Sequence, residues 1–209
     1  MDLWQRLDEV ADRWNVLGHP FYQRWSEGEL SSSELAFYAG QYAHAVDALA
    51  AASRHAAEVA PAGLADELRS HAVEEEAHRA LWQSFAEAAG GEGDARPLPE
   101  TSECVDAWDD DDRDLLPTLV ALYAIESAQP AISDTKRAGL IEHYGFSAGE
   151  GTGYFDVHVV RDVEHAQHGR ELIESRLDGA DVDALVAEAE RVLAANWKLL
   201  DGVERAGRE

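Results

Sequence analysis

Apolar residues recur at helical spacing along almost the whole of this chain, and this pattern limits the folds that it can adopt. Within residues 3–15, for example, Trp4, Leu7, Val10 and Trp14 fall on one stripe of a helix. The alternation that is typical of strands is absent from the sequence. We expect further helices over roughly residues 21–25, 31–59, 64–89, 115–129, 132–144, 152–177 and 181–205. The sequence therefore predicts an all-α fold, a bundle of about seven helices.

The longest expected interruption covers residues 90–112, which are rich in glycine, proline and acidic side chains. We interpret it as a loop within one domain that spans residues 1–209, because neither half of the chain would bury its own helices well. Cys104, the single cysteine, lies in this expected loop. One cysteine excludes an internal disulfide and a thiolate-rich metal site. Any metal must be held by histidines and carboxylates, which suit iron, manganese or zinc.

The formal net charge of −25 argues against nucleic-acid binding, because the phosphate backbone would be repelled. The chain has only two lysines, Lys136 and Lys198, beside fifteen arginines. Acidic excess with few lysines is typical of halophilic proteins, which work in a salt-rich cytosol where charges are screened. An ordinary solvated surface is the alternative interpretation.

No run of about 18 apolar residues is found, so a membrane span is not expected. The first ten residues are acidic and amphipathic, without the basic start and apolar stretch of a signal peptide. We therefore expect a cytoplasmic location.

Three expected helices carry residues of the types that bind metals. On one of them, His158, Asp162 and His165 stand at positions i, i+4 and i+7, so that they share one face over two turns. On a second, Glu75 and His78 form a Glu-x-x-His pair of the kind used in two-metal helical bundles, with Glu74 as the competing acid. For both helices the alternative is a polar face in contact with solvent.

Glu126 is the acidic residue that a structural role explains least well. It ends the apolar run LLPTLVALYAI of residues 115–125. A carboxylate in so apolar a helix is costly to bury unless it is paired or bound to a cation. Together, three imidazoles and three carboxylates suit two metal ions, with Glu126 bridging them and open positions for a small molecule such as O2.

The potential ligands are accompanied by further segments: HPFYQRW at residues 19–25, YAGQY at 38–42, YAIESAQP at 123–130 and YGF at 144–146. With these segments, nearly the whole chain resembles the haem-oxygenase-like dimetal oxidases, a branch of the group that includes the TenA thiaminases and PqqC. Within that family it is most similar to the p-aminobenzoate-forming group, which includes the chlamydial protein associating with death domains.

The resemblance implies a haem-oxygenase-like fold, two iron ions or an iron and a manganese ion, O2 as co-substrate and an external reductant. It also implies that the metal site oxidises a tyrosine of its own chain, with a lysine as amino donor, to make p-aminobenzoate for folate. The matching positions are Tyr22 and Lys136. Family members are often dimers or larger, so we expect a homodimer. In the chlamydial protein, six residues separate the first glutamate ligand from the first histidine ligand. Here only two residues separate Glu75 from His78. Either Glu74 or Glu75 could therefore be the ligand.

Five other interpretations are possible. A dimetal oxygenase could act on an external small substrate, and a PqqC-like oxidase would need no metal. A thiaminase would need a catalytic cysteine in the bundle, which Cys104 does not supply from a loop, and a haem oxygenase would use His19. A non-enzymatic scaffold would not need a buried ligand set. The remaining histidines, His71 among them, are interpreted as mostly structural or exposed.

Overall fold

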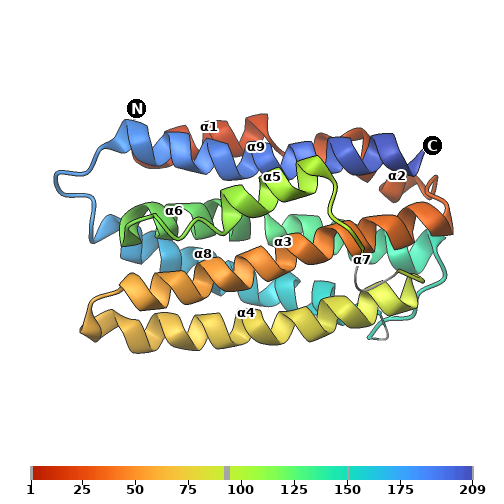
Figure 1. Ribbon diagram of the computed structural model, residues 1–209, viewed down its shortest axis with the longest axis horizontal. Helices are drawn as coiled ribbons and strands as arrows, with labels where there is room; N and C mark the ends of the chain where they lie inside the picture. The colour runs from red at the N-terminus through yellow and green to blue at the C-terminus, as the bar shows by residue number, and fades with distance from the viewer. Residues whose placement is uncertain (1, 92–94, 150, 209) are drawn as a thin grey trace.

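The computed structural model describes residues 2–91, 95–149 and 151–208, and within them every regular element is a helix (Figure 1). The predicted all-α fold is confirmed. The α-helices are α1 (Leu3–Arg13), α2 (Pro20–Glu27), α3 (Ser32–Val59), α4 (Ala62–Ala88), α5 (Pro99–Trp108), α6 (Leu115–Glu126), α7 (Gln129–His143), α8 (Gly153–Glu174) and α9 (Val182–Gly207), with a short 3₁₀ turn at Val16–Gly18.

The long helices run side by side along one axis of the molecule (Figure 1). Helix α3 packs against α4, α9 packs against α1, α5 and α6, and α8 packs against α4, α6 and α7. Helix α8 thus lies between the two other helices from which metal ligands are expected. This arrangement is what brings segments far apart in the sequence to one site.

Side-chain caps define several helix starts. The Ser31 side chain accepts from the backbone N–H of Glu34, and the Glu34 carboxylate accepts in return from the backbone N–H of Ser31, which forms a capping box. At the end of α2, Gly28 adopts a φ of 72°, a left-handed conformation that glycine accepts without strain. These local signals explain why the expected helix boundaries lie close to the observed ones.

The predicted loop over residues 90–112 is partly wrong, because it contains helix α5. Pro99 stands in the first turn of this helix, where its missing N–H costs nothing. Thr101, Cys104 and Trp108 are buried from it against α3 and α9. The segment was predicted as a loop because its many acidic residues outweigh this short apolar stripe in its composition.

Helices α6 and α7 together form one stretch, Leu115–His143, that is long and apolar enough to cross a membrane by length and composition. No such stretch was expected from the sequence. It qualifies because the break near Pro130 is small. More than half of its most apolar window is buried inside the bundle, and a core helix of a soluble protein passes the same test.

Candidate metal centre

The structure brings the six predicted metal ligands together between α4, α6 and α8. Glu75 and His78 come from α4, Glu126 from the end of α6, and His158, Asp162 and His165 from α8. Five of the six are buried, and the His165 side chain keeps only 11% of its surface exposed. Potential ligand atoms of Glu75, His78 and His158 lie within 4.8 Å of one another.

A second group of potential ligand atoms, from His71, Glu75, Glu126 and His165, also fits within 4.8 Å. Glu75 is therefore the carboxylate common to both groups, whereas the sequence hypothesis gave that bridging place to Glu126. Asp162 completes the centre, with its Oδ1 atom 3.6 Å from Nδ1 of His165. Two groups that share one carboxylate are the arrangement expected of a two-metal site.

Eight polar atoms in this centre lack hydrogen-bond partners among the described residues. Such unpaired atoms are costly in a protein interior, and a bound cation would satisfy them. The donor set of imidazole nitrogens and carboxylate oxygens fits iron or manganese. The unpaired atoms are Nε2 of His71 and His158, Nδ1 of His78 and His165, Oε1 of Glu75 and Glu126, and both carboxylate oxygens of Asp162.

His158 is held in the orientation that metal binding requires. Its Nδ1 atom lies 2.6 Å from the backbone carbonyl of Tyr154, an acceptor, so Nδ1 carries the proton and donates it. The lone pair is then on Nε2, the atom left without a partner in the centre. Ligating histidines are commonly oriented by such a contact on the other ring nitrogen.

The charge states of His158 and Glu75 suit a cation as well. Burial lowers the pKa of His158 to about 4, so its ring is neutral at neutral pH. Burial raises the pKa of Asp162 to about 7. Burial also acts to raise the pKa of Glu75, but the contacts from His71 and His78 outweigh it and lower that pKa, which keeps the carboxylate ionised.

The geometry favours Glu75 over Glu74 as the metal ligand. Glu75 is buried within both ligand groups. Glu74 is 38% exposed and pairs with Arg161 at 2.7 Å and with Nε2 of His165 at 3.3 Å. Glu74 thus lies beside the centre and neutralises Arg161.

The residue that sequence reasoning missed is His71. Its Nε2 atom lies 3.1 Å from Oε1 of Glu126 and 3.6 Å from Oε1 of Glu75. It was grouped with the structural or exposed histidines, because single histidines on polar helices are common. The available signal was its spacing of four residues from Glu75 and seven from His78.

A cavity of about 200 Å³ opens beside the His71 end of the centre. Leu68, Leu119 and Leu122 provide an apolar part of its wall, and Arg161 and His168 a polar part. The cavity also touches Glu126 and His165. A small molecule in it would lie next to the ligands.

Tyr22 and Lys136 are both fully enclosed in an aromatic cluster on the other side of the centre. The Lys136 Nζ atom donates to the Tyr38 hydroxyl at 2.7 Å and lies 4.7 Å from the centre of the Tyr22 ring. The hydroxyls of Tyr22 and Tyr38 are 2.9 Å apart. Tyr154, which contacts this cluster through Trp82, stacks on the His158 ring at 3.9 Å. The predicted substrate residues therefore adjoin the ligands through Tyr154.

Burial lowers the pKa of Lys136 well below its usual value. Its amine has no carboxylate partner among the ion pairs of the described residues, and the surrounding ring faces offset only part of the cost of a charge. Lys136 is therefore poised to hold a neutral amine, whose lone pair can act as a nucleophile.

Two residues considered for other activities have different surroundings. Nδ1 of His19 accepts from the backbone N–H of Phe21, and Nε2 donates to Asp201 at 3.1 Å, so both ring nitrogens are engaged. Cys104 is buried in α5, where burial raises its thiol pKa, and it belongs to neither ligand group. Neither residue is arranged as a haem ligand or a reactive thiolate.

Comparison with known proteins shows the family of this chain. Residues 37–197 match a family model described as an iron-containing redox enzyme. The chain is 32% identical to the 4-aminobenzoate synthase of Nitrosomonas europaea, over 95% of this chain and 89% of that protein. It is also 32% identical to the 4-aminobenzoate synthase of Chlamydia trachomatis, over 96% and 91%.

Solved structures share the fold at lower identity. A protein from Shewanella denitrificans with a haem-oxygenase-like fold aligns with a TM-score of 0.83 and 20% identity, over 100% of this chain and 94% of that one. A TenA homologue from P. horikoshii aligns with a TM-score of 0.76 and 16% identity, over 100% and 99%. By its matched residues, its relatives and its fold, this chain belongs to the haem-oxygenase-like family of iron-containing redox enzymes.

Proposed function

We propose that this oxidoreductase holds two metal ions, either two irons or an iron and a manganese, and uses O2 to make 4-aminobenzoate from its own Tyr22, with Lys136 as the amino donor. The observation that carries the proposal is the close approach of a buried lysine, whose pKa is lowered by burial, to a tyrosine ring, beside a set of unpaired metal-binding atoms. The names of the curated relatives support the same product.

The residues around the centre have distinct roles in this proposal. When bound, the metals would activate O2 as the oxidant, and an external reductant would provide the electrons that this activation needs. Glu75, His78, Glu126, His158, Asp162 and His165 would hold them. Tyr38 accepts a hydrogen bond from Lys136, which leaves the amine aimed across the Tyr22 ring. The aromatic enclosure excludes water that would otherwise compete with the amine for an oxidised ring.

A second candidate is oxidation of an external small molecule, favoured by the cavity of about 200 Å³ next to His71, Glu126 and His165. Its apolar wall and its access to the ligands would suit a small, mostly apolar substrate. In this case Tyr22 and Lys136 would remain unchanged after turnover.

The test is to load the protein anaerobically with ferrous iron, count the metal, add O2 and a reductant, and analyse chain and small molecules by mass spectrometry. About two irons per chain with released 4-aminobenzoate and a mass loss at Tyr22 and Lys136 supports the self-modifying oxidase. Two irons with O2 uptake and an unchanged chain supports the external substrate. A chain that binds no metal contradicts both and favours a cofactorless oxidase or a scaffold.

We extend the proposal to the setting of the protein. We propose that it works as a cytoplasmic homodimer that supplies 4-aminobenzoate for folate; the names of the curated relatives support the product. The large acidic excess supports a salt-rich cytosol, and the net charge of −25 argues against nucleic-acid partners.

A further inference from the structure

The same spacing of metal-binding residues occurs on two helices of the centre. Helix α4 has His71-x3-Glu75-x2-His78, and helix α8 has His158-x3-Asp162-x2-His165. In both, a carboxylate stands between two histidines on one helical face, at positions i, i+4 and i+7.

The structure pairs the two motifs in opposite directions. The ring of His71 lies 4.3 Å from that of His165, and the ring of His78 lies 4.4 Å from that of His158. The two interplanar angles are also alike, at 54° and 59°. Each end of the centre thus holds one imidazole from α4 and one from α8.

We propose that His71 is a seventh metal ligand, so that each of the two metal ions is bound by two histidines, one from each helix. This inference rests on the proposed dimetal function. Its Nε2 atom belongs with Glu75, Glu126 and His165 to a group that fits within 4.8 Å. Without His71, that end would hold a single imidazole.

A role for His71 as a mere counter-ion of Glu126 explains less. The contact of 3.1 Å to Glu126 does not have hydrogen-bond geometry, and Nε2 of His71 is left among the buried unpaired atoms. The ring also faces His165, another imidazole, at a distance where two charged rings would repel each other. A shared cation gives both rings and both carboxylates of this group a partner.

The two ends of the centre differ in their access to solvent. The side chain of His71 is 18% exposed and lines the cavity, whereas that of His78 is 7% exposed and lies outside the cavity lining. The ion at the His71 end is therefore the one that exchanges with solution more readily. Loss of His71 should weaken this ion and leave the other in place.

The test uses His71→Ala in the full chain, with metal content after anaerobic ferrous loading as the readout. We expect about two irons in the wild type and about one in the variant, because removal of a ligand lowers the affinity of one site. His71→Glu, which restores a donor, should regain the second iron. His168→Ala is the matched control: His168 lines the same cavity, its Nε2 atom lies 2.9 Å from Oε1 of Glu67, and it belongs to neither ligand group. It should keep two.

X-ray absorption of the loaded wild type provides a second readout that needs no variant. Four imidazoles for each metal pair support His71 as a ligand, and three overturn it. A variant His71→Ala that binds two irons with unchanged affinity overturns the inference but leaves the dimetal proposal intact. A wild type that binds no iron overturns both.

Discussion

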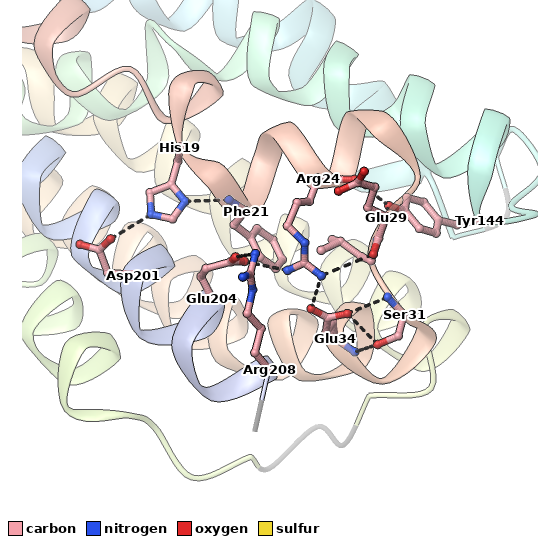
Figure 2. A network of polar contacts seen from close by, with 11 residues as sticks. His19, Phe21, Arg24, Glu29, Ser31, Glu34, Tyr144, Asp201, Glu204 and Arg208 are labelled. Atoms are coloured by element: carbon pink, nitrogen blue, oxygen red, sulfur yellow. Dashed lines mark hydrogen bonds and ion pairs between the residues drawn. The ribbon is translucent and has the colours of Figure 1, made fainter.

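Two polar clusters of this bundle differ in how far their buried polar atoms are paired. Along α2, Arg24 donates to Glu34 at 2.6 Å and to Glu204 at 2.9 Å, and His19, which precedes the helix, uses both ring nitrogens (Figure 2). These contacts tie α2 to α3 and α9 through complete pairs. Between α4, α6 and α8, by contrast, ligand atoms from seven side chains are buried without a hydrogen-bond partner among the described residues.

The difference separates polar groups that hold the fold from those that await a ligand. A network with complete pairs adds stability by itself, whereas unpaired buried donors and acceptors cost about 1–3 kcal/mol each. A fold retains such groups when something else satisfies them. The metal-free centre should therefore be a source of instability that loading removes.

The largest effect is expected from Glu75→Ala. Because Glu75 belongs to both ligand groups, its loss should reduce the iron content from about two per chain to well below one and abolish O2 consumption. Metal analysis after anaerobic loading measures this. Glu76→Ala is the control, since Glu76 is exposed and pairs with Arg54 and Arg79. Retention of both irons by the Glu75 variant would contradict the bridging role.

Lys136→Met should abolish 4-aminobenzoate formation while the iron content stays near two. The variant should also gain stability, by roughly 1–3 kcal/mol, because it replaces a buried amine that lacks a carboxylate partner. Product analysis and chemical denaturation measure the two effects. Lys198→Met, at an exposed ion pair with Glu103, should change neither. Product release by the Lys136 variant would exclude it as the nitrogen source.

Arg24→Met tests the complete network. It leaves the largely shielded Glu34 without its cation and Glu204 with Arg208 alone, and should cost roughly 1–3 kcal/mol of folding free energy with no change in iron affinity. Urea unfolding measures the loss. Arg13→Met removes an exposed pair with Glu190 and should cost less than about 1 kcal/mol. Equal losses in the two variants would show that the Arg24 network stabilises the fold no more than an exposed ion pair does.

The smallest effect concerns pH. Burial lowers the pKa of His19 below 6.5 in the folded state, and a second ring proton would confront the N–H of Phe21. As the pH falls below 6.5, the unfolded chain binds this proton first, so stability should fall by at most about 1.4 kcal/mol per pH unit. His19→Asn keeps an acceptor for Phe21 and should flatten this part of the curve. Melting temperatures between pH 7 and 5 measure it, and identical curves would refute the assignment.

Much of the centre could be predicted from the sequence because helical spacing is a local property. His158, Asp162 and His165 share a face by their numbers alone, and Glu126 stands out in an apolar helix. The meeting of α4 with α8 depends on tertiary packing, which no local pattern contains. For this reason the spacing of His71 was visible in the sequence but its partner on α8 was not.

The fold shows the same division. Caps and breakers marked most helix ends, and the core helices followed from apolar periodicity. Helix α5 was missed because its four buried positions are surrounded by acidic residues and its stability comes from α3 and α9. Tyr38 was likewise not singled out, since its contact with Lys136 joins residues 98 positions apart.

The position of the ligands along the chain has a consequence for unfolding. A metal pair that joins α4 to α8 closes a loop of roughly 80 residues, much as a disulfide would, in a chain whose single cysteine can form no internal one. In the loop-entropy description, a cross-link stabilises a fold mainly because it restricts the unfolded chain. The metals would then act as a reversible cross-link. Their release would increase the conformational freedom of the unfolded chain, which must be lost again at each refolding.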